Sequence, residues 1–172
     1  MLMANLQATL RSQLLFCNCA KDCIGRANNL LFKSTDTTKF ITLFFGILDT
    51  EKNILTYCNA GHNEPIFLQN NKEGKLDKGG MILSILEDIE YEEENINFEI
   101  GSTLIVFTDG ITEAMNEQEE EYGEERLYNL IESKSDLPSK QLAEEIMRDV
   151  RNFSSAIPQS DDITMTIIKR IK

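Results

Sequence analysis

The chain has 172 residues, 41% of them hydrophobic, which is enough for one domain with a sizeable core that needs no disulfides. Its 17 Lys and Arg against 29 Asp and Glu give a net charge of -12. Because such a surface repels the phosphates of nucleic acids and of anionic lipids, the composition argues against both as partners.

No apolar run approaches the roughly 20 residues of a membrane span, and no signal-like segment opens the chain, so we expect a cytoplasmic protein. The four cysteines, Cys17, Cys19, Cys23 and Cys58, could form two disulfides in an oxidising compartment, but nothing else suggests secretion. The first three lack the CxxC pairs of a zinc site, and Cys19 and Cys23 would share one helix face. Reduced thiols with a packing role are the favoured interpretation.

Helical periodicity opens the chain. Leu2–Phe16 places leucines at helical spacing and contains neither Gly nor Pro. A second helix is predicted from about Cys19 to Lys33, with Gly25 as its weak point.

Short apolar runs follow, which is the pattern of β-strands. The run Lys39–Leu48 is apolar almost throughout and indicates a central strand covered on both faces. Ile54–Asn59 and Pro65–Gln69 are separated by a Gly- and Asn-bearing connection, so all three runs are expected to form an antiparallel meander. The polar stretch Asn70–Lys78 is predicted to be an exposed loop.

The second half of the chain begins with strands at Asn95–Glu99 and Thr103–Thr108, joined by a turn around Gly101. Two amphipathic helices are then predicted at Glu124–Ser133 and Ser139–Phe153, with Ser139 as a candidate N-terminal cap.

The last element is a predicted strand, Ile163–Ile171. Helix pairs at both ends of a run of strands indicate one layered α+β domain over residues 1–172, in which helices cover the faces of sheets.

Two short motifs place carboxylates beside small residues where a predicted strand meets a turn. They are Thr-Asp-Gly at 108–110 and Ser-Asp-Asp at 160–162. Converging Asp carboxylates at such ends can hold a hard cation such as Mg²⁺ or Mn²⁺ while leaving waters bound. Alternatively, the first motif is an ordinary turn and the second a solvated strand start, and spacing alone leaves both interpretations open.

Three longer blocks follow one another along the chain: FITLFFGILDTEKNILTYCNAGHNEP, IGSTLIVFTDGITEAMNEQEEEYGEERL and QSDDITMTII. In this order they resemble the phosphatase domain of SpoIIE and RsbU proteins in the PPM superfamily. Together with the lead-in LLFCNCAKDCIGRANNLLF they cover nearly the whole chain.

This resemblance implies a layered α-β-β-α sandwich of antiparallel sheets flanked by helices. It also implies hydrolysis of phosphoserine or phosphothreonine on a partner protein in bacterial signalling, often an anti-sigma-factor antagonist, by a water that Mn²⁺ or Mg²⁺ activates. Neither a side-chain nucleophile nor a phosphoenzyme is then needed, so no catalytic side chain is predicted beyond the metal ligands.

Carried over residue by residue, the resemblance makes Asp109 and Asp161 metal ligands, with Asp162 as a neighbouring candidate. We expect the carboxylates of Asp109 and Asp161 to lie within roughly 4–8 Å, near enough to share metal ions or to bridge through water.

Three further residues match the family's motifs. His62, in the Asn-Ala-Gly-His-Asn turn, would support the metal ligands or face the substrate, or would only bond to backbone in a hairpin turn. Gly110 and Glu113 would lie beside Asp109, with Glu113 one turn away if a helix begins there. A solvated position for Glu113 is the other interpretation.

The sequence departs from the family's pattern in one important respect. No Asp-x-x-Gly-x-Gly segment precedes the first helix, so the family's first metal-binding Asp and its strands have no counterpart. The resemblance implies two ions, Mn²⁺ or Mg²⁺, in a full-length site, and we expect weak or absent occupancy and little activity in this chain. The alternative is a non-catalytic, phosphatase-like binding or regulatory module. Ser84 and Ser102 also stand where the family usually has Gly and Asp.

Overall fold

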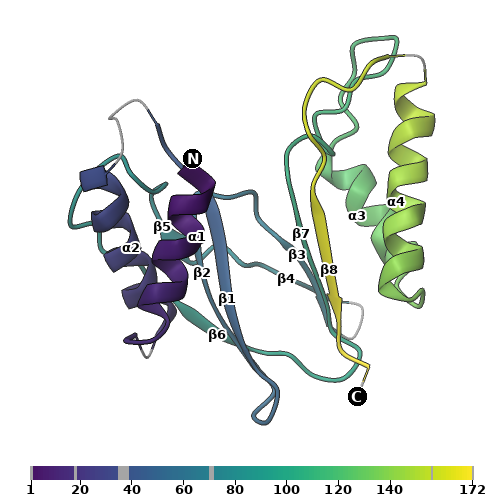
Figure 1. The fold of residues 1–172 in the computed structure, drawn as a ribbon. Coiled ribbons are helices and arrows are strands. Elements are labelled where there is room, and N and C mark those ends of the chain that lie inside the picture. Colours follow the sequence, from purple (N-terminus) through teal and green to yellow (C-terminus); the bar gives the residue numbers. More distant parts are fainter. Residues whose placement is uncertain (1, 18, 35–38, 70–71, 156, 172) are drawn as a thin grey trace. The chain divides into compact units, whose positions relative to one another are not determined.

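The computed structural model describes residues 2–17, 19–34, 39–69, 72–155 and 157–171. They form two compact units, residues 1–64 with 76–98 and residues 65–75 with 99–172 (Figure 1).

The first unit pairs two helices with a four-stranded sheet. Strand β2 lies inside this sheet, antiparallel to β1 at one edge and paired at the other with β6, antiparallel, and β5, parallel. The elements are α1 (Leu2–Gln13), α2 (Ala20–Ser34), β1 (Leu43–Asp49), β2 (Ile54–Ala60), β5 (Gly79–Gly80) and β6 (Glu94–Asn97).

The core of the first unit lies where α2 contacts β1 and β2, and α1 packs along α2 (Figure 1). Its buried side chains include Leu6, Ile24, Leu31, Ile41, Cys58, Leu83 and Tyr91. All four cysteines are free, in agreement with the prediction. Burial raises the pKa of Cys23 and of Cys58 to about 12, so both thiols are protonated packing groups at neutral pH.

A buried amide fastens α2 to the segment after β5. Asn28 is fully buried. Its Oδ1 accepts the backbone N–H of Ser84 at 2.9 Å, and its Nδ2 donates to the Leu86 carbonyl at 2.8 Å. Asn29 makes a similar but exposed pair of bonds with Asp88, so two adjacent asparagines hold residues 84–88 against the helix.

The second unit is an antiparallel sheet in the order β4-β3-β7-β8, with two helices. The elements are β3 (Ile66–Gln69), β4 (Lys72–Gly74), β7 (Thr103–Phe107), α3 (Glu124–Ser133), α4 (Ser139–Ser154) and β8 (Met165–Lys169).

The amphipathic faces of α3 and α4 supply much of the second core. Helix α4 contacts both α3 and β8 (Figure 1). The core side chains include Ile66, Ile105, Phe107, Ile111, Leu127, Ile131, Leu142, Ile146 and Val150. At its margin the carboxylate of Asp149 accepts Nε of Arg126 at 2.9 Å and the hydroxyl of Tyr122 at 2.8 Å, so it ties α4 to the start of α3.

Three expectations about the strands need correction. Within the described residues β1 pairs only with β2, so the apolar run is an edge strand with exposed residues at 46–48 and is not covered on both faces. The meander stops after β2, because β3 belongs to the other sheet. The expected loop at 70–78 contains β4, and Leu76 is fully buried. Apolar runs report burial, whereas strand partners depend on contacts distant in sequence.

The helices agree closely with the periodicity. The capping prediction for Ser139 is wrong, because Pro138 occupies the N-cap position and no side-chain cap bond forms. In the part of the chain that the structure describes, no helix has the length and apolar character needed to cross a membrane.

Candidate metal-binding site

The first predicted carboxylate, that of Asp109, lies two residues after the end of β7. From Asp109 the chain makes a tight turn in which the Asp109 carbonyl accepts the Glu113 N–H at 2.8 Å and the Thr112 hydroxyl at 3.3 Å. Ile111 anchors this turn in the core and is fully buried. Asp109 is therefore held, half-buried, at a strand end. Glu113 follows one turn later as expected, but it is exposed and no regular helix begins there.

The turn is bonded to the segment that precedes β8. The backbone N–H of Thr108 donates to the Thr164 carbonyl at 3.0 Å. Its hydroxyl donates to the Asp162 carbonyl at 3.0 Å and accepts the Thr164 N–H at 2.9 Å. Two segments more than fifty residues apart in sequence are thereby fixed side by side.

Gly110 allows these two backbones to approach closely. A Cβ at this position would lie 2.7 Å from the carbonyl oxygen of Asp162 and 3.3 Å from that of Asp161. Both contacts are with backbone, which cannot rotate away as a side chain can. Gly110 is thus required by packing against the acidic pair, a role that its motif alone does not reveal.

Asp161 and Asp162 are exposed in this segment. The Asp161 carboxylate accepts the N–H of Asp162 at 2.7 Å, and the Gln159 amide donates to the Asp161 carbonyl. The backbones that carry Asp109, Asp161 and Asp162 therefore lie together as the sequence predicts, while the separation of the carboxylates stays a prediction.

The donor set suits a hard cation. Among the described residues no three His, Cys, Asp or Glu side chains are arranged as a metal site. Mg²⁺, however, often binds protein through only one or two carboxylates and keeps several waters. Carboxylates on two adjoining, partly solvated backbone segments fit that requirement, and Mn²⁺ favours the same oxygen ligands.

A family model described as Stage II sporulation protein E (SpoIIE) matches residues 1–171. The chain belongs to the SpoIIE family. Protein IcfG of Synechocystis sp. is 29% identical to it over 137 residues, which are 78% of this chain and 21% of IcfG. Phosphoserine phosphatase RsbU of Bacillus subtilis is 32% identical over 93 residues, which are 52% of this chain and 28% of RsbU. The chain thus spans less than a third of the length of either curated relative.

A solved structure similar to this chain shows the fold. The SiaA-PP2C domain of Pseudomonas aeruginosa superposes with a TM-score of 0.83 over 98% of this chain and 68% of that chain, at 16% identity. The predicted α+β phosphatase fold is therefore confirmed.

His62 belongs to the other compact unit of this SpoIIE-family chain. The Asn59 side chain bonds to both backbone groups of His62: its Oδ1 accepts the His62 N–H at 2.8 Å, and its Nδ2 donates to the His62 carbonyl at 3.0 Å. The ring Nδ1 lies 3.4 Å from the Thr42 hydroxyl. His62 also lines a pocket of about 470 Å³ with Glu64 and Glu92, and its functional role stays a prediction.

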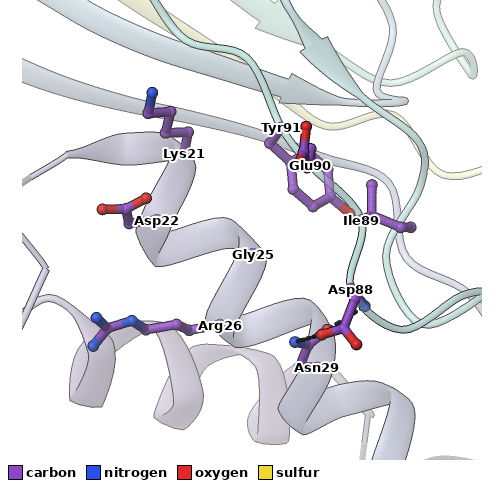
Figure 2. A pocket seen from close by; sticks show the side chains of 9 residues that line it. All are labelled: Lys21, Asp22, Gly25, Arg26, Asn29, Asp88, Ile89, Glu90 and Tyr91. Atoms are coloured by element: carbon purple, nitrogen blue, oxygen red, sulfur yellow. Dashed lines mark hydrogen bonds between the residues drawn. The ribbon is translucent and has the colours of Figure 1, made fainter.

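Another pocket, of about 540 Å³, lies between α2 and residues 88–91 (Figure 2). Figure 2 shows Lys21, Arg26 and Asn29 on the helix. Asn29 is hydrogen-bonded to Asp88, which belongs to the facing segment. None of the predicted site residues lines this pocket. Sequence reasoning missed it because its walls come from two distant segments and because its charged side chains resemble an ordinary solvated helix face.

Proposed function

We propose that this chain acts as a metal-dependent protein phosphatase, hydrolysing phosphoserine or phosphothreonine on a partner protein in bacterial cytoplasmic signalling. The observation that carries the proposal is the attachment of the Asp109 turn to the Asp161–Asp162 segment, in a chain that the SpoIIE model matches almost end to end. RsbU, a relative, is a phosphoserine phosphatase, which supports the same chemical class. An anti-sigma-factor antagonist is the proposed kind of substrate, and the domain is proposed to be the whole of residues 1–172.

The proposed ligands are Asp109, Asp161 and Asp162. Mn²⁺ or Mg²⁺ bound there would supply a water of lowered pKa and neutralise phosphoryl oxygens. The chain's own residues would hold and orient the metal ligands. The turn after β7 fixes Asp109, and Gly110 lets Asp161 and Asp162 approach it. The exposure of Asp161 and Asp162 leaves the site open to a phosphorylated side chain on another protein. Without a cation these carboxylates would repel a phosphate ester.

The second candidate function is a non-catalytic, phosphatase-like binding module. Among the described residues no three His, Cys, Asp or Glu side chains are grouped as a metal site, an arrangement that a binding module does not need. Such a module would bind a phosphoprotein or its partner without turning it over.

Hydrolysis of p-nitrophenyl phosphate and of a phosphoserine peptide with increasing Mn²⁺ would test the proposal. Because the site is expected to bind metal weakly, we expect low turnover by the wild-type chain that appears only at high Mn²⁺, and its loss in Asp109→Asn and Asp161→Asn. Asp136→Asn is a matched control, because Asp136 is an exposed aspartate at the other end of the sheet from Asp109. The carbonyl of its neighbour Leu137 accepts Lys169 Nζ at 2.6 Å, and Lys169 pairs with Thr103, at the end of β7 remote from Asp109.

Turnover that survives Asp109→Asn and Asp161→Asn would refute the ligand assignment. Absence of turnover at saturating Mn²⁺, together with measurable binding of a phosphoprotein, would instead support the binding module. Addition of an Asp-x-x-Gly-x-Gly segment at the N-terminus is expected to raise both Mn²⁺ affinity and turnover if a further ligand is needed.

A further inference from the structure

The Thr108 side chain occupies an unusual place in the ladder between β7 and β8. The strands pair in antiparallel register as far as Phe107 opposite Met165. One step further, the Thr108 N–H still donates to the Thr164 carbonyl, as a regular ladder requires. The return bond does not reach the Thr108 carbonyl, because the Thr164 N–H donates to the Thr108 hydroxyl at 2.9 Å.

The carbonyl of Thr108 is used elsewhere. It accepts the N–H of Ile111 at 3.2 Å and so begins the turn that presents Asp109. The hydroxyl therefore replaces a backbone acceptor that has turned away from the sheet. Its own proton goes to the Asp162 carbonyl at 3.0 Å, so one side chain satisfies backbone groups on both sides of Ile163.

We infer that Thr108 is a positioning residue, whose hydroxyl couples the Asp109 turn to the Asp161–Asp162 segment and thereby sets the affinity of the cation site. The inference rests on the proposed function. A threonine hydroxyl can be donor and acceptor at once, which this position needs and which neither valine nor alanine provides. Outer partners that orient metal ligands commonly change metal affinity when removed, by about 10- to 100-fold.

The test compares three variants for Mn²⁺ affinity by calorimetric titration and for hydrogen exchange of residues 161–166 in metal-free protein. Thr108→Val keeps the shape of the side chain and removes both bonds. Thr108→Ser keeps the hydroxyl. Thr166→Val is the control, because Thr166 is an exposed threonine of β8 opposite Val106.

We expect Thr108→Val to bind Mn²⁺ at least about tenfold more weakly than wild type and to exchange the Thr164 amide faster. Thr108→Ser and Thr166→Val should stay within about threefold of wild type, a difference that general loss of side-chain packing would not produce. Urea unfolding of each variant confirms that the titrated protein is folded.

Two results would overturn this inference and leave the proposed function standing. They are an unchanged Mn²⁺ affinity in Thr108→Val, or a loss of Mn²⁺ affinity in Thr108→Ser equal to that in Thr108→Val. Failure of the wild-type chain to bind Mn²⁺ would instead overturn the proposed function, and with it the metal role of Thr108. The exchange rate of the Thr164 amide reports the hydroxyl bond in either case, so the two failures are distinguishable.

Discussion

Replacement of Asn28 by alanine should destabilise the first unit, because its buried amide bonds to two backbone groups of another segment. The substitution removes the acceptor of the Ser84 N–H and the donor to the Leu86 carbonyl, in a position with no exposed surface. A buried backbone group left without a partner costs about 1–3 kcal/mol. The Leu86 carbonyl is only part-buried, so we expect a total loss of about 2–4 kcal/mol.

Asn29→Ala is the matched control. It changes the same residue type on the same helix and removes two exposed bonds with Asp88, which water can replace. It also removes the long bond that Asn29 Oδ1 accepts from Asn28 Nδ2 at 3.4 Å, but Asn28→Ala removes the same bond, so its loss cancels in the comparison. Both substitutions gain the same helix propensity, so the difference between them isolates burial. We expect a loss of about 1 kcal/mol or less for Asn29→Ala.

Urea unfolding followed by circular dichroism would give both free energies, provided that the slope of the transition is the same in the three proteins. Equal losses for Asn28→Ala and Asn29→Ala would refute the reasoning. A shallower slope for Asn28→Ala alone would show instead that residues 84–88 detach before the rest of the unit unfolds.

Three further predictions concern other sites. Gly110→Ala should weaken Mn²⁺ binding at least about tenfold, because its Cβ would displace the backbone of Asp162; unchanged affinity in a titration would contradict the packing argument. Ser84→Gly should raise stability by about 1 kcal/mol, since Ser84 has φ 73 and its hydroxyl is buried with no partner in the described structure. A lower melting temperature for this variant would show that the strain is absent. Arg126 holds the pKa of Asp149 below its ordinary value by a side-chain hydrogen bond, so this carboxylate stabilises the fold above about pH 3.9 and loses that effect as pH falls through the lowered pKa. Unfolding between pH 6 and 2 should therefore show a steeper acid loss in wild type than in Asp149→Asn, and parallel curves would contradict this.

Local sequence determined the helices well. The periodicity predicts a helix at Glu124–Ser133, and α3 has these bounds. The same periodicity predicts another helix that begins at Ser139, where α4 begins, although Ser139 is not its cap. The backbone hydrogen bonds of a helix join residues four apart, so the amphipathic pattern that predicts a helix lies entirely within the helical segment.

The sequence also predicts where the candidate site lies. Thr-Asp-Gly follows an apolar strand, and the structure indeed ends β7 at Phe107, immediately before it. What the motif could not reveal is the part played by Thr108 and Gly110, because their roles are defined by the carbonyls of residues 161 and 162, which reach them only through the pairing of β7 with β8.

Strand partners were decided only by the tertiary structure. The most apolar run became the edge strand β1, and the turn after β2 leads to β3 in a different sheet, so adjacency in sequence did not become strand pairing. Ladder bonds join residues of separate segments, and which segment supplies them depends on how whole faces pack. The sequence alone determined where carboxylates meet strand ends, and the pairing of distant strands decided which of these ends lie together.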